Sequence, residues 1–232
     1  MARAPLPGTW AWLAWVVASA VSAAQADPAG REAKLRELEL DIEQLHRFGG
    51  MLVELDQKLG SLPRFGPQTP SVQRRYCELL LRSALLKQSA INRAIAAYGI
   101  DVRNVPFGVA YSPHGGMRDR EGATYVDGDG TIRVEIGDEA FASAARLGST
   151  IAHEVEVHVN RQVVNGIFFA SADEQGWLIQ EVEAYDYELA SKERFGLSAD
   201  EIRLVKLRRA SCYRRLQWEN RRRADAALYV AR

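Results

Sequence analysis

The stretch TIRVEIGDEAFASAARLGSTIAHEVEVH, residues 131–158, decides the fold. Its first six residues alternate between polar and β-branched side chains, a pattern typical of a half-buried strand. From Asp138 the composition changes to one typical of helices, and this part carries His153 and His158. The stretch therefore predicts a strand that is followed directly by helices bearing two of the four histidines of the chain.

Two segments before this stretch have the same β-branched and aromatic character, namely Phe107–Tyr111 and Ala123–Val126. The sequence Asp127-Gly-Asp-Gly130 separates the second of them from the strand at 131–136 and is a strong hairpin-turn signal. Together these segments predict a small antiparallel sheet.

Helices are expected on both sides of this sheet. Before it, they are predicted at 31–60 and 72–98, separated by a proline-rich loop at 61–71; after it, at 138–146, 148–164, 173–194 and 198–229. The predicted fold class is α+β, mostly helical, with the sheet preceding the His-Glu helix. The expected organisation is a signal peptide at 1–26, a helical region at 27–104, an α+β core at 105–200, and a basic helix at 201–232 packed on the core.

The first helix carries leucines at seven-residue intervals, at positions 38, 45, 52 and 59. We expect an amphipathic helix that packs on its own domain. A short coiled coil, and with it a homodimer through residues 31–60, is the alternative. Gly49-Gly50 is a predicted break in this helix.

The N-terminal residues have the features of a secretory signal peptide. Arg3 precedes an apolar stretch from Trp10 to Val21, and Ala24-Gln25-Ala26 offers small residues for cleavage. The apolar stretch is shorter than the roughly 20 residues that a membrane-spanning helix needs. A periplasmic or secreted protein with no transmembrane segment after cleavage is expected, and Cys77 and Cys212 would form a disulfide or remain two free thiols.

Charge is balanced in the chain as a whole, with 30 Lys and Arg against 30 Asp and Glu. Residues 202–232 are strongly basic, with ten basic residues against Glu219 and Asp225. Export argues against nucleic acid as the partner of this segment. A solvated basic face is expected, with anionic lipid or an acidic protein as alternative partners.

The chemistry is concentrated in Ser149-Thr-Ile-Ala-His-Glu-Val-Glu-Val-His158 and in the later segment Gln180-Glu-Val-Glu-Ala-Tyr-Asp-Tyr-Glu188. Two imidazoles and one carboxylate can hold a zinc ion, with a free glutamate to take a proton from the bound water. The candidate zinc ligands are His153, His158 and Glu181, and the candidate base is Glu154.

The two histidines are five residues apart, one more than in the usual His-Glu-x-x-His motif. On a regular α-helix this spacing separates them by roughly 140°. A π-bulge would bring both to one face, and such bulges are frequent at functional sites. Alternatively, Glu154 and His158 are the ligands of this helix, or the site binds no metal.

The third ligand can be chosen from the apolar stripe of Leu178, Val182, Tyr185 and Leu189. Glu181 lies at the edge of this stripe, whereas Glu183 lies on its far side. Glu181 is therefore the predicted ligand and Glu183 a surface residue. Glu188 is close to the line of Glu181 and is a candidate outer partner, and Tyr185 is either a hydrogen-bond donor to an oxyanion or a core residue.

The pattern His153-Glu-x-x-x-His158 with Glu181-x-x-Ala184 resembles the zincin metallopeptidases whose third ligand is a glutamate in a following helix. The wider pattern over roughly residues 105–200 is also similar to C-terminal domains of some bacterial polymorphic toxins. The resemblance implies one zinc ion held by His153, His158 and Glu181, with Glu154 as the base. The expected function is thus an exported zinc-dependent hydrolase acting on a protein or peptide, and the alternative is an inactive metal-binding or interaction domain.

Overall fold

The computed structural model describes residues 28–62, 68–112, 121–167 and 174–230. The expected signal peptide lies outside the described residues, as does His114. Within the described residues, no helix combines the length and apolar character needed to cross a membrane.

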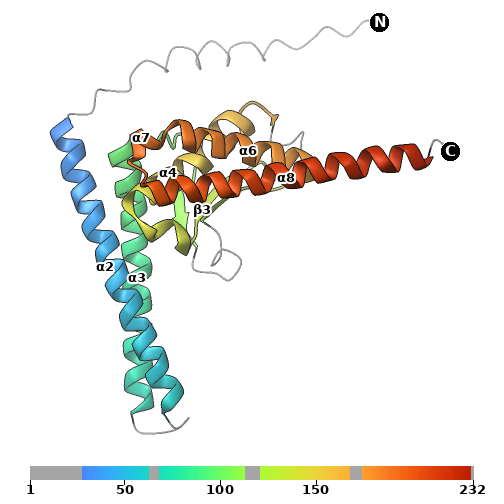
Figure 1. Ribbon diagram of the computed structural model, residues 1–232. Coiled ribbons are helices and arrows are strands. Elements are labelled where there is room, and N and C mark those ends of the chain that lie inside the picture. The colour runs from blue at the N-terminus through green and yellow to red at the C-terminus, as the bar shows by residue number, and fades with distance from the viewer. Residues whose placement is uncertain (1–27, 63–67, 113–120, 168–173, 231–232) are drawn as a thin grey trace, which may run out of the picture.

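Two long helices, α2 (Pro28–Ser61) and α3 (Thr69–Tyr98), lie side by side as a hairpin that projects from the rest of the molecule (Figure 1). Leu38 and Leu45 of the heptad stripe are buried in the same core cluster as Ile91 of α3. The stripe therefore packs within the chain. The predicted break at Gly49-Gly50 is wrong, because α2 continues through both glycines. Each glycine costs a helix only about 1 kcal/mol, which packing along α3 can offset.

Helix α3 ends at Gly99, whose φ of 61° places it in the left-handed region that glycine adopts without strain. The last residue of the helix, Tyr98, is buried and packs against the backbone of Gly148. A Cβ at position 148 would lie 2.3 Å from the tyrosine ring. This contact joins the hairpin to the helices that follow the sheet.

The sheet has three strands in the order β1-β3-β2, with bounds Val109–Tyr111, Ile132–Ile136 and Gly122–Val126 respectively. Strands β2 and β3 form the predicted antiparallel hairpin, but β1 is parallel to β3. The prediction of an antiparallel sheet is therefore wrong for β1, and the sheet is mixed. Val134 and Ile136 of β3 are almost fully buried, which accounts for the central position of this strand.

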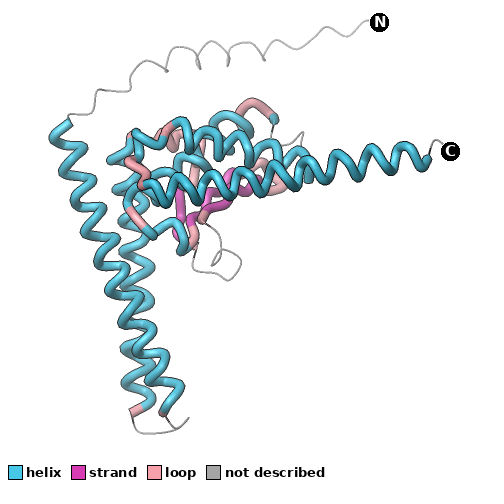
Figure 2. The backbone as a smooth tube through the Cα atoms, in the orientation of Figure 1, coloured by secondary structure: helices cyan, strands magenta, loops and turns pink. Residues whose placement is uncertain are grey.

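The described residues after the sheet are mostly helical, with short loops between the helices (Figure 2). A 3₁₀ turn (η1, Asp138–Ala142) leads to α4 (Ala144–Ala152), where Ser143 caps the helix by accepting a hydrogen bond from the Arg146 amide. Then come the π-helix η2 (His153–Val163), α6 (Glu174–Ala190), the short α7 (Lys192–Phe195) and α8 (Ala199–Val230).

One hydrophobic core unites these elements. It contains Leu45 of α2, Ile136 of β3, Ile151 of α4 and Val155 of η2. The fold is therefore mostly helical α+β, as predicted. The sheet and the pair α6 and α8 lie on either side of η2, which positions the site described next.

Candidate metal centre

Helix η2 brings the two histidines together because its hydrogen bonds follow the π pattern. In a π-helix each amide bonds five residues back, so residues five apart are neighbours on one face. The rings of His153 and His158 are accordingly 4.9 Å apart between centroids, and both are buried. The local distortion expected from the sequence is present, and with eleven residues it is longer than a single bulge.

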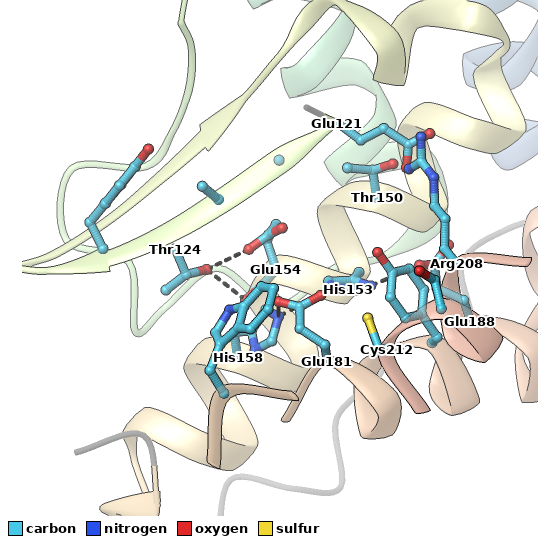
Figure 3. Close-up of a pocket in the computed structure, with 16 residues that line it drawn as sticks. Glu121, Thr124, Thr150, His153, Glu154, His158, Glu181, Glu188, Arg208 and Cys212 are labelled. Carbon is cyan, nitrogen blue, oxygen red and sulfur yellow. Dashed lines mark hydrogen bonds and ion pairs between the residues drawn. The ribbon is translucent and has the colours of Figure 1, made fainter. Parts of the chain in front are cut away.

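Three side chains converge on one point between η2 and α6 (Figure 3). The Nε2 atoms of His153 and His158 are 3.1 Å apart. The carboxylate of Glu181 lies 3.4 Å from Nε2 of His158 and 3.7 Å from Nε2 of His153. Among the described residues, these three form the group of His, Cys, Asp and Glu side chains able to share one ion.

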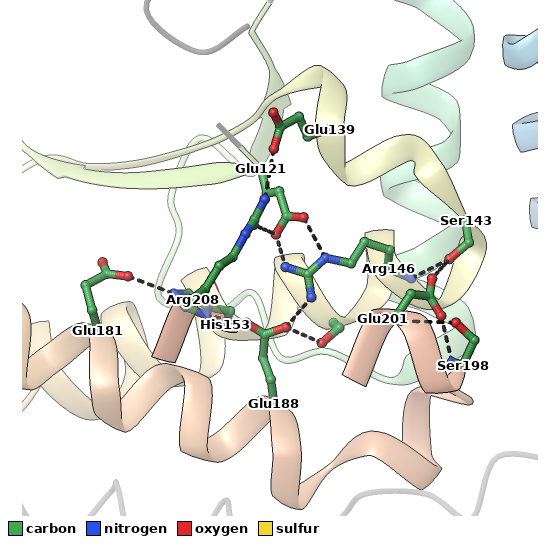
Figure 4. A network of polar contacts seen from close by, with 11 residues as sticks. Glu121, Glu139, Ser143, Arg146, His153, Glu181, Glu188, Ser198, Glu201 and Arg208 are labelled. Atoms are coloured by element: carbon green, nitrogen blue, oxygen red, sulfur yellow. Dashed lines mark hydrogen bonds and ion pairs between the residues drawn. The ribbon is translucent and has the colours of Figure 1, made fainter. Parts of the chain in front are cut away.

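His153 is oriented by a buried ionic network (Figure 4). Its Nδ1 is 2.7 Å from Oε1 of Glu188, whose other oxygen accepts hydrogen bonds from Arg146 and Ser149. Burial favours protonation of Glu188, but the hydrogen bond with His153 and the nearby charges outweigh it and lower its pKa to about 2. The carboxylate is thus ionised and can only accept, so Nδ1 of His153 carries the hydrogen and Nε2 faces Glu181.

His158 is oriented by an amide. Its Nδ1 is 2.7 Å from Oε1 of Gln162. The Nε2 group of Gln162 donates to the carboxylate of Glu183 at 3.0 Å and to the carbonyl oxygen of Gln180 at 3.3 Å. These two acceptors decide the orientation of the amide, so Nδ1 of His158 donates and its Nε2 also points toward the centre.

The spacing of the donor atoms is compatible with one shared ion. At zinc–ligand distances of about 2.0–2.1 Å, atoms 3.1 Å apart would subtend about 100° at the ion, and atoms 3.4 Å apart about 110°. The third distance, 3.7 Å from Nε2 of His153 to the other oxygen of Glu181, would subtend a wider angle of about 130°. Without a cation or a proton between them, two nitrogen lone pairs at this distance would repel each other. The donor set of two imidazoles and one carboxylate therefore fits zinc.

The charges around the centre favour a dication. Four carboxylates, those of Glu121, Glu154, Glu181 and Glu188, are buried or nearly so, against the guanidinium groups of Arg146 and Arg208. With neutral imidazoles this leaves an excess of two negative charges. Burial opposes protonation of His153, but its hydrogen bonds to Glu181 and Glu188 outweigh burial and raise its pKa to about 10. Burial also opposes the charged forms of His158 and Glu181, but their interactions with each other and with neighbouring charges outweigh it. The pKa of His158 is therefore raised and that of Glu181 is lowered.

Glu154 is buried beside this centre but points toward the sheet. Its Oε2 accepts a hydrogen bond of 2.8 Å from the hydroxyl of Thr124 on β2. A Cβ at Gly122 would lie 2.8 Å from Cγ of Glu154, so only glycine allows the strand to approach this closely. Burial raises the pKa of Glu154, although the two histidines counteract this. The alternative in which Glu154 and His158 are the metal ligands is not favoured, since Glu154 is outside the converging group.

A cavity of about 500 Å³ opens onto the centre. The strand β2 forms one wall, and Trp177 of α6 with Arg208, Ser211 and Cys212 of α8 forms another. The ring of Tyr185 packs edge-on against His153, with 5.0 Å between centroids. The site is therefore accessible from a cleft that runs along the edge of the sheet.

The converging group includes neither cysteine, and it includes neither His46 nor Glu183. Cys77 is exposed on α3 and Cys212 lines the cavity; both are free thiols, so the disulfide alternative is wrong. Nε2 of His46 is 3.1 Å from the carbonyl oxygen of Phe141, which gives it a structural role. Glu183 is exposed and accepts a hydrogen bond from Gln162, the partner of His158.

Sequence reasoning missed Gln162, Arg146 and Thr124. The position of Gln162, four residues after His158, was the one available signal, because residues at that spacing are close on a helix. Nothing local marks Arg146 or Thr124, whose contacts span 25 to 42 residues of chain.

Comparison with protein-family models, with curated proteins and with solved structures found no match to this chain. The functional argument therefore depends on the geometry of the site.

Proposed function

We propose that this chain is a zinc-dependent hydrolase that cleaves peptide bonds, with His153, His158 and Glu181 as ligands and Glu154 as general base. One observation carries the proposal. The two Nε2 atoms lie 3.1 Å apart, and both rings donate their other hydrogen to buried acceptors, Glu188 and Gln162. Such outer partners are typical of histidines that bind metal.

Zinc bound at such a site polarises a carbonyl group and lowers the pKa of a coordinated water to about 7. The role of Glu154 follows from its surroundings. It is buried next to the ligands, and its raised pKa brings it closer to the neutral range in which a general base accepts a proton efficiently. Thr124 holds the carboxylate in position.

The edge of β2 supports a peptide as the substrate class. Hydrogen bonds from Asp127 to Thr131 and from Gly137 to Glu121 flank the antiparallel ladder. Because bonding alternates along such a ladder, the backbone groups of Gly122 and Thr124 point away from β3, toward the free edge. An extended peptide can add to this edge as a further strand, beside the metal ligands.

The second candidate is a metal-binding domain without turnover. It shares the three ligands and differs only in the role of Glu154. The buried position of Glu154, in the wall of the cavity that the three ligand candidates also line, favours the hydrolase. Export to the periplasm or beyond, as the N-terminal residues indicate, belongs to the same proposal.

Zinc content and peptide cleavage test the proposal together. We expect about one zinc per chain in the purified protein, lost in His158→Ala and retained in His46→Ala, a matched histidine outside the site. We expect Glu154→Gln to keep the zinc and lose cleavage of a mixed peptide library, by on the order of 10²-fold or more. Full activity of Glu154→Gln would refute the assigned base. A zinc-loaded wild-type chain without any activity would favour the second candidate.

A further inference from the structure

Three arginines of α8 form ion pairs with other elements: Arg208 with Glu121 and Glu139, Arg209 with Asp186, and Arg215 with Glu174. These pairs attach one side of the helix to the core. Two further pairs, Arg203 with Asp200 and Arg222 with Glu219, lie within α8 itself.

The outer face has a different composition. Lys206, Arg214 and Arg221 are exposed, and none of them forms an ion pair with another residue in the part of the chain that the structure describes. With Ala210 and Gln217 between them, they follow spacings of three and four residues, so they form one straight row on the helix. At 1.5 Å per residue, the row from Lys206 to Arg221 is roughly 22 Å long.

Large apolar side chains flank this row. Leu207 and Trp218 lie along one side of it and are 59% and 57% exposed, and Tyr213 lies along the other side at 47%. From Lys206 to Arg221 the only acidic residue is Glu219, which is buried on the inner face. Figure 1 shows that the C-terminal part of α8 extends past the other described elements.

We propose that this outer face, defined by Lys206, Leu207, Arg214, Trp218 and Arg221, binds the surface of an anionic phospholipid bilayer. Cations attract the headgroups, and leucine and tryptophan enter the interfacial region, which is the combination that membrane-surface helices use. The face is a straight, convex helix surface without a cavity among the described pockets, so it suits a flat bilayer better than a projecting protein segment. The proposal does not rest on the metal centre, which lies on the other side of α8.

Vesicle sedimentation tests the proposal on the processed chain that cleavage after Ala26 would leave. We expect binding to vesicles of phosphatidylcholine with phosphatidylglycerol, little binding to phosphatidylcholine alone, and weaker binding as salt is added. Each cation contributes about fivefold, so Lys206→Gln, Arg214→Gln and Arg221→Gln together should weaken binding on the order of 100-fold.

A matched triple variant provides the control. Arg74, Arg75 and Arg82 are exposed on α3, and changing them to glutamine removes the same net charge from a different surface. This control should bind almost as well as the wild type. For the aromatic contribution, Trp218→Ala should weaken binding, and Trp177→Ala, which alters the cavity, should not.

Three results would overturn the proposal. The first is no binding to anionic vesicles at low salt by a chain whose circular dichroism is that of the folded protein. The second is an equal loss of vesicle binding in both triple variants, which would show that binding depends on net charge and not on this face of α8. The third is tighter binding to a single-stranded oligonucleotide than to vesicles.

Discussion

Replacing Glu188 by glutamine should abolish the metal-binding form of His153 with almost no change in side-chain size. One oxygen of Glu188 accepts from Arg146 and Ser149, and the other accepts from Nδ1 of His153, each at 2.7 Å. A glutamine that keeps its oxygen toward Arg146 must turn its NH₂ group toward Nδ1. His153 would then accept at Nδ1 and carry its hydrogen at Nε2, where the metal has to bind.

The magnitude follows from these contacts. Changes in the hydrogen-bond partners of metal-binding histidines typically cost 10–100-fold in metal affinity, or about 1.4–2.7 kcal/mol. Arg146 would also lose one of its two carboxylate partners, in a position where breaking a buried pair costs about 3–5 kcal/mol. We expect a loss of stability at the lower end of this range, because Glu121 still accepts hydrogen bonds from two nitrogens of Arg146.

Competition with a chromogenic chelator measures the zinc affinity, and circular dichroism verifies that the variant is folded. Glu183→Gln is the matched control on the same helix, since an amide oxygen can still accept from Gln162. We expect Glu183→Gln to bind zinc like the wild type. Equal zinc affinity in wild type and Glu188→Gln would refute the reasoning that Glu188 selects the tautomer of His153.

Two further predictions concern stability. In the zinc-free protein the raised pKa of His153, about 10, contributes stability that is present below pH 6.5 and lost as the pH rises toward 10. The lowered pKa of Glu188, about 2, contributes stability that is present above pH 4.5 and lost as the pH falls toward 2. The free energy of unfolding in urea should therefore be highest between pH 4.5 and 6.5. On either side it should fall by up to about 1.4 kcal/mol per pH unit for each proton. A free energy of unfolding that stays constant from pH 6.5 to 10 would contradict the assigned network. Gly148→Ala should destabilise the fold by roughly 1–3 kcal/mol, because the new Cβ would lie 2.3 Å from the Tyr98 ring. Gly60→Ala, where nothing lies within 4 Å, is its control in the same urea titration, and an equal effect of both changes would argue against the Tyr98 contact.

Local patterns were sufficient to predict most of the elements. Four of the six predicted helical segments and all three strands lie where periodicity and turn residues place them, to within a few residues. The predicted break between 146 and 148 is wrong, because α4 runs through it from Ala144 to Ala152. Helix α3 ends at Gly99, close to the predicted bound, because glycine adopts the left-handed conformation there without strain. The direction of β1 relative to β3 was not predictable from the sequence. In so short a strand, the path of the flanking segments decides whether the pairing is parallel or antiparallel.

The sequence by itself determined the order of helices and strands and the residues available for chemistry, His153, Glu154, His158 and Glu181. Periodicity also distinguished Glu181 from Glu183. The apolar stripe of a helix predicts which side faces the core, and Glu181 lies closer to that stripe. Only the tertiary structure decided that residues 153–163 wind as a π-helix, which turns the two imidazoles onto one face. It alone placed Glu188, Gln162 and Thr124 against His153, His158 and Glu154. The physical reason is that tautomer, ring orientation and charge balance depend on hydrogen bonds between segments distant in the chain, and local sequence patterns carry no record of those contacts.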